Sequence, residues 1–196
     1  MFIKKLIIEK PTEIIREIDF CSGLNLIIDD TPFENTKSTG NNVGKTTVLK
    51  LIDFCLGAKG KIIYTDTENK NEEYDIVKNF LVDEEIEVKL LLTENLNDPN
   101  AKILKIQRNF LQGKKAIRKI NGNSILEKDF EKELEKRIMP NKEVEKPTFR
   151  QIISHNIRYK DDSINNTLKT LDKFTTDIEY ETLYLYLLGC SFDEGA

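Results

Sequence analysis

Residues 39–47, TGNNVGKTT, are the stretch that decides the predicted fold. The tripeptide Gly44-Lys45-Thr46 matches the G-K-[ST] end of a glycine-rich Walker A loop. Leu24–Ile28, a nearly continuous apolar run, precedes the loop and suits a strand buried on both faces of a sheet. Val48–Leu56 follows with the spacing of a largely buried helix that should end at Gly57. This order of strand, loop and helix makes the match more specific than a chance Gly-Lys-Thr.

The residue types of the loop suit the binding of a triphosphate. Phosphate oxygens need many N–H donors, and the free amides at the start of a helix supply them with a favourable dipole. Lys45 is expected to reach the β- and γ-phosphates and is a candidate catalytic residue, while the Thr46 hydroxyl is the candidate Mg²⁺ ligand and Thr47 can bond the α-phosphate. The predicted nucleotide-binding residues are Thr39, Gly40, Asn41, Asn42, Val43, Gly44, Lys45, Thr46 and Thr47. The expected cofactors are therefore ATP and Mg²⁺.

Two positions depart from the usual loop pattern. Its first glycine falls on Thr39, with Gly40 one place later, and a position that is commonly glycine holds Asn42. Asparagine is the non-glycine residue that best tolerates a left-handed backbone, and Gly40 can take the tight turn one residue late. Both departures fall in the first half of the loop, before Gly44-Lys45-Thr46.

Strand-like segments lie on both sides of the loop and helix. Apolar stretches bounded by turn residues predict two strands before the loop and an antiparallel accessory sheet after the helix. The predicted strands are Phe2–Ile8, Ile14–Phe20, Ile62–Tyr64, Ile86–Leu92, Ile103–Phe110 and Ala116–Ile120. The sequence FLQG, at residues 110–113, is predicted to turn a hairpin within this region.

Helical patterns fill the last third of the chain. Asp129–Met139 has the apolar spacing of an amphipathic helix, Thr148 can cap a second helix, and Thr176 with Glu179 has the spacing of a capping box before a third. We therefore divide the chain into a nucleotide-binding lobe with its accessory sheet, residues 1–126, and a helical region, residues 127–196.

Composition limits the class of protein. The chain has 196 residues, 39% of them hydrophobic, which is enough for one sizeable core. Its net charge of -4 does not predict nucleic-acid binding in the way that a basic domain would. Cys21, Cys55 and Cys190 suit reduced, buried thiols. With no signal-peptide core and no membrane-spanning run, the expected location is cytoplasmic.

Three stretches resemble a known family. GLNLIIDD at residues 23–30, the loop itself and KTTVLKLIDFCLG at residues 45–57 look like the N-terminal lobe of SMC-, RecF- and RecN-like ABC ATPases. The polar insertion before the loop and the LIDFCLG ending resemble coiled-coil ATPases of the bacterial ABC-three-component type, which are linked to defence against mobile DNA. Residues 103–125 resemble the paired-strand region of that family.

This resemblance implies an α/β fold: a P-loop NTPase lobe of ABC or SMC head type with an antiparallel β subdomain and a C-terminal helical region. It also implies ATP hydrolysis that needs a C-terminal lobe or a homodimer partner, because no signature motif, Walker B carboxylates or switch histidine are found in this sequence. Accessory subunits and DNA are implied as partners by resemblance alone. The nearest imitation of a Walker B, ending in Asp193 and Glu194, is better explained as a capped helix.

The family also uses a glutamine to bridge Mg²⁺ and the attacking water. Gln151 is our candidate for this catalytic and metal-binding role, and a plain place on a helix surface is the alternative. His155, the only histidine, is expected to have a surface or packed role and no metal. Two other functions stay open for the chain: a self-contained small P-loop kinase or NTPase, and a scaffold module without nucleotide.

Overall fold

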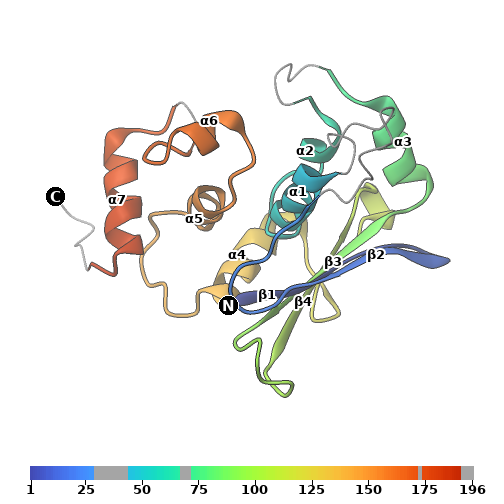
Figure 1. The fold of residues 1–196 in the computed structure, drawn as a ribbon, viewed down its shortest axis with the longest axis horizontal. Helices are drawn as coiled ribbons and strands as arrows, with labels where there is room; N and C mark the ends of the chain where they lie inside the picture. Colours follow the sequence, from blue (N-terminus) through green and yellow to red (C-terminus); the bar gives the residue numbers. More distant parts are fainter. Residues whose placement is uncertain (29–43, 67–71, 172–173, 191–196) are drawn as a thin grey trace.

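The structure, a computed structural model, describes residues 1–28, 44–66, 72–171 and 174–190. It combines one sheet with helices packed beside it (Figure 1). In chain order the elements are β1 (Phe2–Lys10), β2 (Glu13–Asp19), α1 (Lys45–Cys55), α2 (Lys61–Tyr64), α3 (Asp75–Asp83), β3 (Glu87–Thr93), β4 (Ile103–Asn109), the 3-10 turn η2 (Gly113–Lys115), β5 (Arg118–Ile120), β6 (Asn123–Ser124), α4 (Glu127–Ile138), α5 (Phe149–Asn156), α6 (Asp161–Asn165) and α7 (Asp177–Leu187).

The sheet has six strands, all antiparallel, in the order β2-β1-β3-β4-β5-β6. One row of side chains crosses its four central strands: Leu6 pairs with Leu90, Leu90 with Ile106, and Ile106 with Ile120. All four side chains are fully buried. Since directly opposed residues share a face of the sheet, this row lies on the face that packs into the hydrophobic core.

The opposite face of the sheet is polar and half exposed. Lys89 of β3 forms an ion pair with Glu9 of β1, and Gln107 of β4 donates a hydrogen bond of 2.7 Å to Glu87. Because side chains alternate along a strand, one face can meet the helices while the other meets water. The mixed α/β character and the antiparallel strands that the sequence predicts are confirmed.

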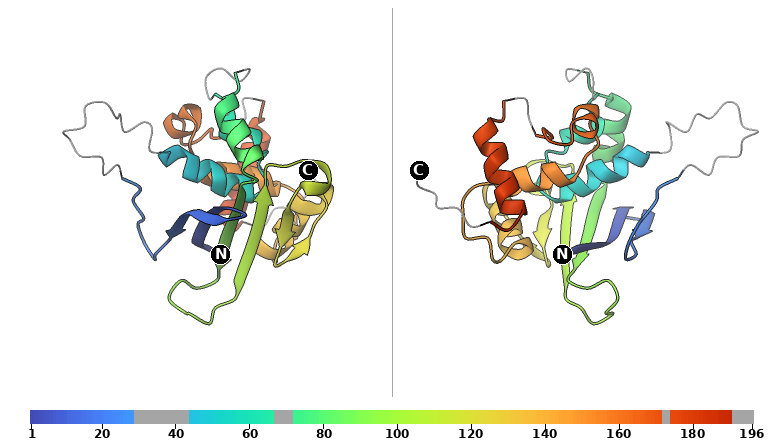
Figure 2. Two further views of the ribbon diagram at one scale, coloured as in Figure 1. Left: turned by 90° about the vertical axis from the view of Figure 1, so that its right-hand side faces the viewer. Right: turned by 60° about the vertical axis from the view of Figure 1, so that its left-hand side comes forward.

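Two helices cover the apolar face (Figure 1, Figure 2). α1 contacts β3 and β4, α4 contacts β5, and Phe130 and Leu134 of α4 are buried. The predicted helix at Val48–Leu56 is confirmed, although it begins three residues earlier, and it is buried from Lys50 onwards. It ends before Gly57, whose φ of 107° is one that glycine adopts without strain.

The helical region is capped as the sequence predicts. Thr148 and Gln151 form a capping box at the start of α5, and Thr176 and Glu179 form another at the start of α7. In each box the threonine hydroxyl accepts a hydrogen bond from the third helical N–H, and the side chain of that third residue accepts one from the threonine N–H.

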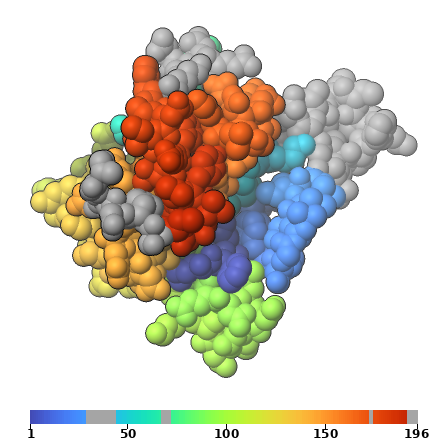
Figure 3. Space-filling view, turned by 90° about the vertical axis from the view of Figure 1, so that its left-hand side faces the viewer, coloured from blue at the N-terminus to red at the C-terminus, as the bar shows by residue number. Residues whose placement is uncertain are grey.

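The structure contradicts the predicted strand at Leu24–Ile28. These residues form no strand, and the side chains of Leu24, Leu26 and Ile28 are 82%, 73% and 72% exposed. The segment lies on the surface in light blue (Figure 3). A strand buried on both faces needs neighbours, and among the described residues no strand pairs with this segment, while β2, the strand before it, stays at the edge of the sheet. An apolar run predicts what a segment can bury, whereas the rest of the fold decides whether a neighbour is present.

Two further predictions need correction. The strands after α1 do not form a separate accessory sheet, since β3 pairs directly with β1. The predicted strand Ile62–Tyr64 is the short helix α2, because a run of three apolar residues is too short to distinguish a strand from a helical turn. The predicted hairpin turn at FLQG is confirmed, with Gly113 at a φ of 62° between β4 and β5.

The cysteines differ partly from the prediction. All three are free thiols, as expected, but only Cys55 is buried, and burial raises its pKa to about 12. Cys21 and Cys190 are exposed, since the former follows β2 at the edge of the sheet and the latter follows α7. Across the described part of the chain, no helix combines the length and the apolar character needed to cross a membrane.

Candidate nucleotide-binding site

The described part of the predicted loop is the start of α1. Gly44 is the N-cap residue, with a left-handed backbone of φ 70° and ψ 22°. A Cβ atom placed there would lie 3.8 Å from the Thr47 side chain, an ordinary contact, so the backbone angle and not the space favours glycine. The carbonyl of Gly44 accepts a 3.3 Å hydrogen bond from the N–H of Val48, which closes the first helical turn. Predicted residues Thr39, Gly40, Asn41, Asn42 and Val43 lie outside the described residues.

This helix start has the properties of an anion site. Lys45, Thr46 and Thr47 are all exposed, and Gly44 has no side chain with which to cap the helix. The first turn of α1 also contains no acidic residue. The first N–H groups of a helix have no partner within the helix, and the dipole favours negative charge near them. An anion at this place would therefore meet main-chain donors, the Lys45 ammonium and two hydroxyls.

The other end of α1 is fixed by a buried acid. Asp53, 5% exposed, accepts hydrogen bonds from Arg150 Nη2 at 2.8 Å and from the Tyr159 hydroxyl at 2.9 Å. Arg150 Nη1 also donates to the carbonyl of Leu56 at 2.9 Å. Burial and the nearby Asp53 carboxylate raise the pKa of Tyr159, so its hydroxyl keeps its proton and remains a donor. This Asp53 cluster holds α1 while leaving its first turn open.

A second arginine, from the sheet, also binds main-chain carbonyls at the C-terminal end of α1. Arg108 of β4 donates through Nη1 to the carbonyl of Phe54, and to that of Ala58 at 2.8 Å. Its guanidinium lies 4.1 Å from the centre of the Phe54 ring. Cations near the last carbonyls of a helix are stabilising. The C-terminal end of α1 is therefore held by Arg108 of the sheet and by Arg150 of the helical region.

Gln151 lies at the start of α5 and not beside Lys45 at the start of α1. Its side-chain oxygen accepts a 2.8 Å hydrogen bond from the Thr148 N–H, and its Nε2 donates to Glu179 of α7 at 3.1 Å. Its neighbour Arg150 meets α1 at Asp53, which at about 1.5 Å per residue is roughly 12 Å along the helix from Lys45. The structure thus places Gln151 in the cap of α5, and a role at Mg²⁺, which would require the amide to leave both partners, stays a prediction.

Comparison with known protein families finds no model that matches this chain. Comparison with curated proteins finds no matching sequence either. The assignment of a function therefore depends on the residues themselves and on the geometry that the fold gives them.

The exposed hydroxyl of Thr46 could serve as the protein ligand of the expected Mg²⁺. Among the described residues, no three His, Cys, Asp or Glu side chains lie together as a metal-binding group. In a phosphate-binding loop, Mg²⁺ is held mainly by phosphate oxygens, water and one Ser or Thr hydroxyl. Thr46, exposed in the first turn of α1, is the residue that fits this requirement.

His155 has a packed role, as the sequence predicts. It is 8% exposed, its Nδ1 lies 2.8 Å from the Thr170 hydroxyl, and its ring meets the Tyr184 ring of α7 edge-on at 5.5 Å between centres. Burial, and to a smaller degree the charge of Arg158, lowers its pKa. The neutral imidazole therefore helps to join α5 to α7.

This environment predicts a loss of stability in weak acid. A histidine whose pKa is lower in the folded state than in the unfolded state, where it is about 6.5, makes the unfolded state the better proton acceptor. The contribution of neutral His155 to the free energy of unfolding should thus be at its maximum above pH 6.5. It should fall as the pH drops below that value, by at most about 1.4 kcal/mol per pH unit. Denaturant titrations between about pH 5 and 7 measure this slope.

The control for this prediction is His155→Gln, which should flatten the slope above the range in which carboxylates titrate. Because His155 is the only histidine in the chain, its proton NMR signals report its pKa without ambiguity. A measured pKa at or above 6.5 would contradict the prediction.

Proposed function

We propose that this chain binds ATP with Mg²⁺ at the start of α1. The observation that carries the proposal is the left-handed Gly44 directly before the exposed residues Lys45, Thr46 and Thr47, on a helix whose other end is fixed. In this assignment Lys45 offers its charge to the β- and γ-phosphates, and Thr47 its hydroxyl to the α-phosphate. Mg²⁺, held in part by Thr46, would neutralise charge that develops on the phosphates during transfer.

We further propose that the chain acts as the N-terminal part of an SMC- or RecN-like ATPase head. Supporting this, Leu24, Leu26 and Ile28, which precede the loop in the chain, expose apolar side chains, although such a run suits a buried strand. A C-terminal lobe or a second copy of the chain would cover this segment. Hydrolysis would then depend on that partner, because the sequence supplies Lys45 but no assigned Walker B carboxylates.

The biological setting follows from the family resemblance alone. On that basis we propose a role in DNA repair, DNA maintenance or defence against mobile DNA, with accessory subunits as further partners. The three free cysteines, two of them exposed, suit the reducing cytoplasm.

Binding and turnover of ATP by the purified chain test the proposal together. We expect one ATP–Mg²⁺ to bind per chain, seen by calorimetry, with little or no steady hydrolysis until a partner lobe is added. Steady multiple turnover by the monomer would favour the self-contained kinase or NTPase instead. If no nucleotide gave a thermal shift or a calorimetric signal, the chain would be a scaffold module and the proposal would be wrong.

A further inference from the structure

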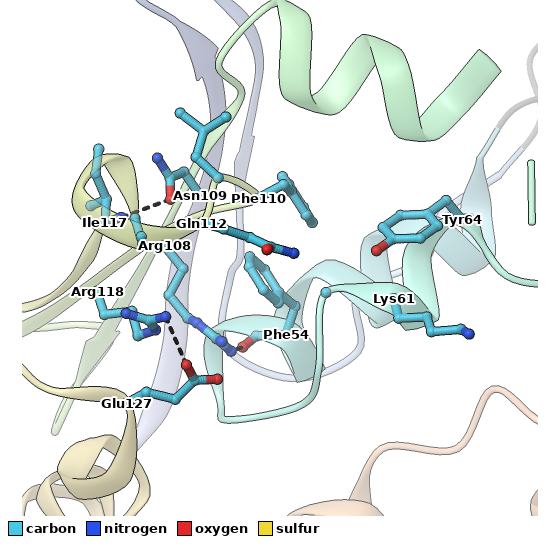
Figure 4. A pocket seen from close by; sticks show the side chains of 14 residues that line it. Phe54, Lys61, Tyr64, Arg108, Asn109, Phe110, Gln112, Ile117, Arg118 and Glu127 are labelled. Carbon is cyan, nitrogen blue, oxygen red and sulfur yellow. Dashed lines mark hydrogen bonds and ion pairs between the residues drawn. The ribbon is translucent and has the colours of Figure 1, made fainter. Parts of the chain in front are cut away.

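A cavity lies beyond the C-terminal end of α1, away from the predicted loop. It has a volume of about 330 Å³ and opens between α2 and the connection from β4 to β5. Figure 4 shows Arg118 and Glu127 on one side of it, the rings of Phe54 and Phe110 in the middle, and Tyr64 on the other side. None of the residues predicted to bind nucleotide or Mg²⁺ lines this cavity.

The aromatic wall of the cavity is held in a fixed position. The Phe54 and Phe110 rings stack with centres 4.6 Å apart and an angle of 11° between their planes. The backbone of Gly60 lies against the edges of both rings, since a Cβ atom there would be 3.1 Å from Phe110 and 3.3 Å from Phe54. Phe54 is buried, whereas Phe110 is only partly buried, and both line the cavity. Such a wall favours a flat, apolar group.

The charges of the cavity favour an anion. Arg108, 9% exposed, lines it and bonds to two main-chain carbonyls, but within the described residues it has no carboxylate as ion-pair partner. Its Nε is buried and without a hydrogen-bond partner. Burial lowers the pKa of this guanidinium to about 10, which reflects the cost of keeping the charge away from water.

A second arginine at the cavity is already engaged with an acid. Arg118 Nη2 forms an ion pair of 2.9 Å with Glu127, whose side chain is 79% exposed. An exposed pair of this kind contributes little stability, so an incoming anion can compete for Arg118. Lys61 also lines the cavity but forms an ion pair of 3.1 Å with Glu73, so Arg108 is the charged lining residue without an ion-pair partner among the described residues.

We propose that this cavity binds a small organic ligand that joins an aromatic ring to an anionic group. The ring would pack on Phe110, and the anion would bind Arg118 and offset the unpaired charge of Arg108. Capping of α1 by Arg108 explains its bonds to the carbonyls of Phe54 and Ala58. It does not explain the unpaired Nε or the open aromatic wall.

Phenyl phosphate is the probe for this proposal. The titrations use the full chain carrying Lys45→Ala, so that binding of phosphate at the predicted loop is weakened. We expect saturable 1:1 binding in calorimetry, with weaker binding of inorganic phosphate, which lacks the ring, and of phenol, which lacks the charge. Arg118→Gln and Phe110→Ala should each weaken the binding of phenyl phosphate by about tenfold. Glu127→Gln should tighten it, because the competing carboxylate is gone.

Lys119→Gln is the matched control, because Lys119 follows Arg118 on β5 and its side chain leaves the opposite face of the sheet. Circular dichroism melts establish whether each variant is folded. If Phe110→Ala does not fold, the comparison of Arg118→Gln with wild type tests the proposal. The proposal is overturned if phenyl phosphate does not bind. It is also overturned if Arg118→Gln and Glu127→Gln leave the affinity unchanged, because phenyl phosphate would then bind elsewhere on the chain.

Discussion

Replacing Lys45 with alanine is expected to weaken the binding of ATP–Mg²⁺ by about 100-fold. The ammonium group is exposed at the first residue of α1, where it can meet two phosphates at once. Charge-assisted hydrogen bonds contribute about 1.5–3 kcal/mol, and each 1.4 kcal/mol changes a dissociation constant tenfold. Calorimetric titration of the wild-type chain and of Lys45→Ala with ATP–Mg²⁺ measures the difference.

Lys59→Ala is the control for this prediction. Lys59 is also exposed, but it follows the buried end of α1, so its loss should leave the affinity within about twofold of wild type. An equal affinity of wild type and Lys45→Ala would show that the nucleotide binds elsewhere or through other groups, and the assignment of the loop would fail.

Replacing Asp53 with alanine is expected to lower the free energy of unfolding by about 3 kcal/mol. The change leaves Arg150 partly buried without its carboxylate, and it removes the acceptor for the Tyr159 hydroxyl. Breaking a buried pair from one side usually costs about 3–5 kcal/mol, and the lower end applies here because the Arg150 side chain is 23% exposed. Chemical denaturation followed by circular dichroism measures the loss.

Asp83→Ala provides the matched comparison, since Asp83 is an exposed acid at the end of α3 and its loss should change stability by less than about 0.5 kcal/mol. Tyr159→Phe should have an intermediate effect, because it removes one of the two donors to Asp53 and leaves the ion pair. If Asp53→Ala were no more harmful than Asp83→Ala, the Asp53 cluster would not be what anchors α1.

The parts of the fold that the sequence predicts well are those set by local chemistry. The capping boxes at Thr148 and Thr176 need only residues three apart, and the alternating strands β3 and β4 bury every second side chain until their last two residues, which are both buried. The start of α1 is predicted for the same reason, because Gly44-Lys45-Thr46 and the apolar spacing that follows are both short-range signals.

What the sequence does not predict depends on partners far away along the chain. Leu24–Ile28 has the composition of a buried strand, yet strand formation needs a neighbour, and the described residues provide none beside it. Asp53 stands out as an acid within an apolar helix pattern, which is a signal in itself. Its donors, Arg150 and Tyr159, are 97 and 106 residues away, and no spacing rule identifies them. The aromatic and arginine cavity is likewise assembled from α1, α2, β4 and β5.

The most direct test of the central claim is an NMR titration of the isotopically labelled chain with ATP–Mg²⁺, followed through the main-chain amide signals. We expect the amides of Gly44, Lys45, Thr46 and Thr47 to shift most and to saturate together at one nucleotide per chain. Saturable binding with these four amides unmoved, for example with the shifts gathered around Tyr64 and Phe110 instead, would contradict it.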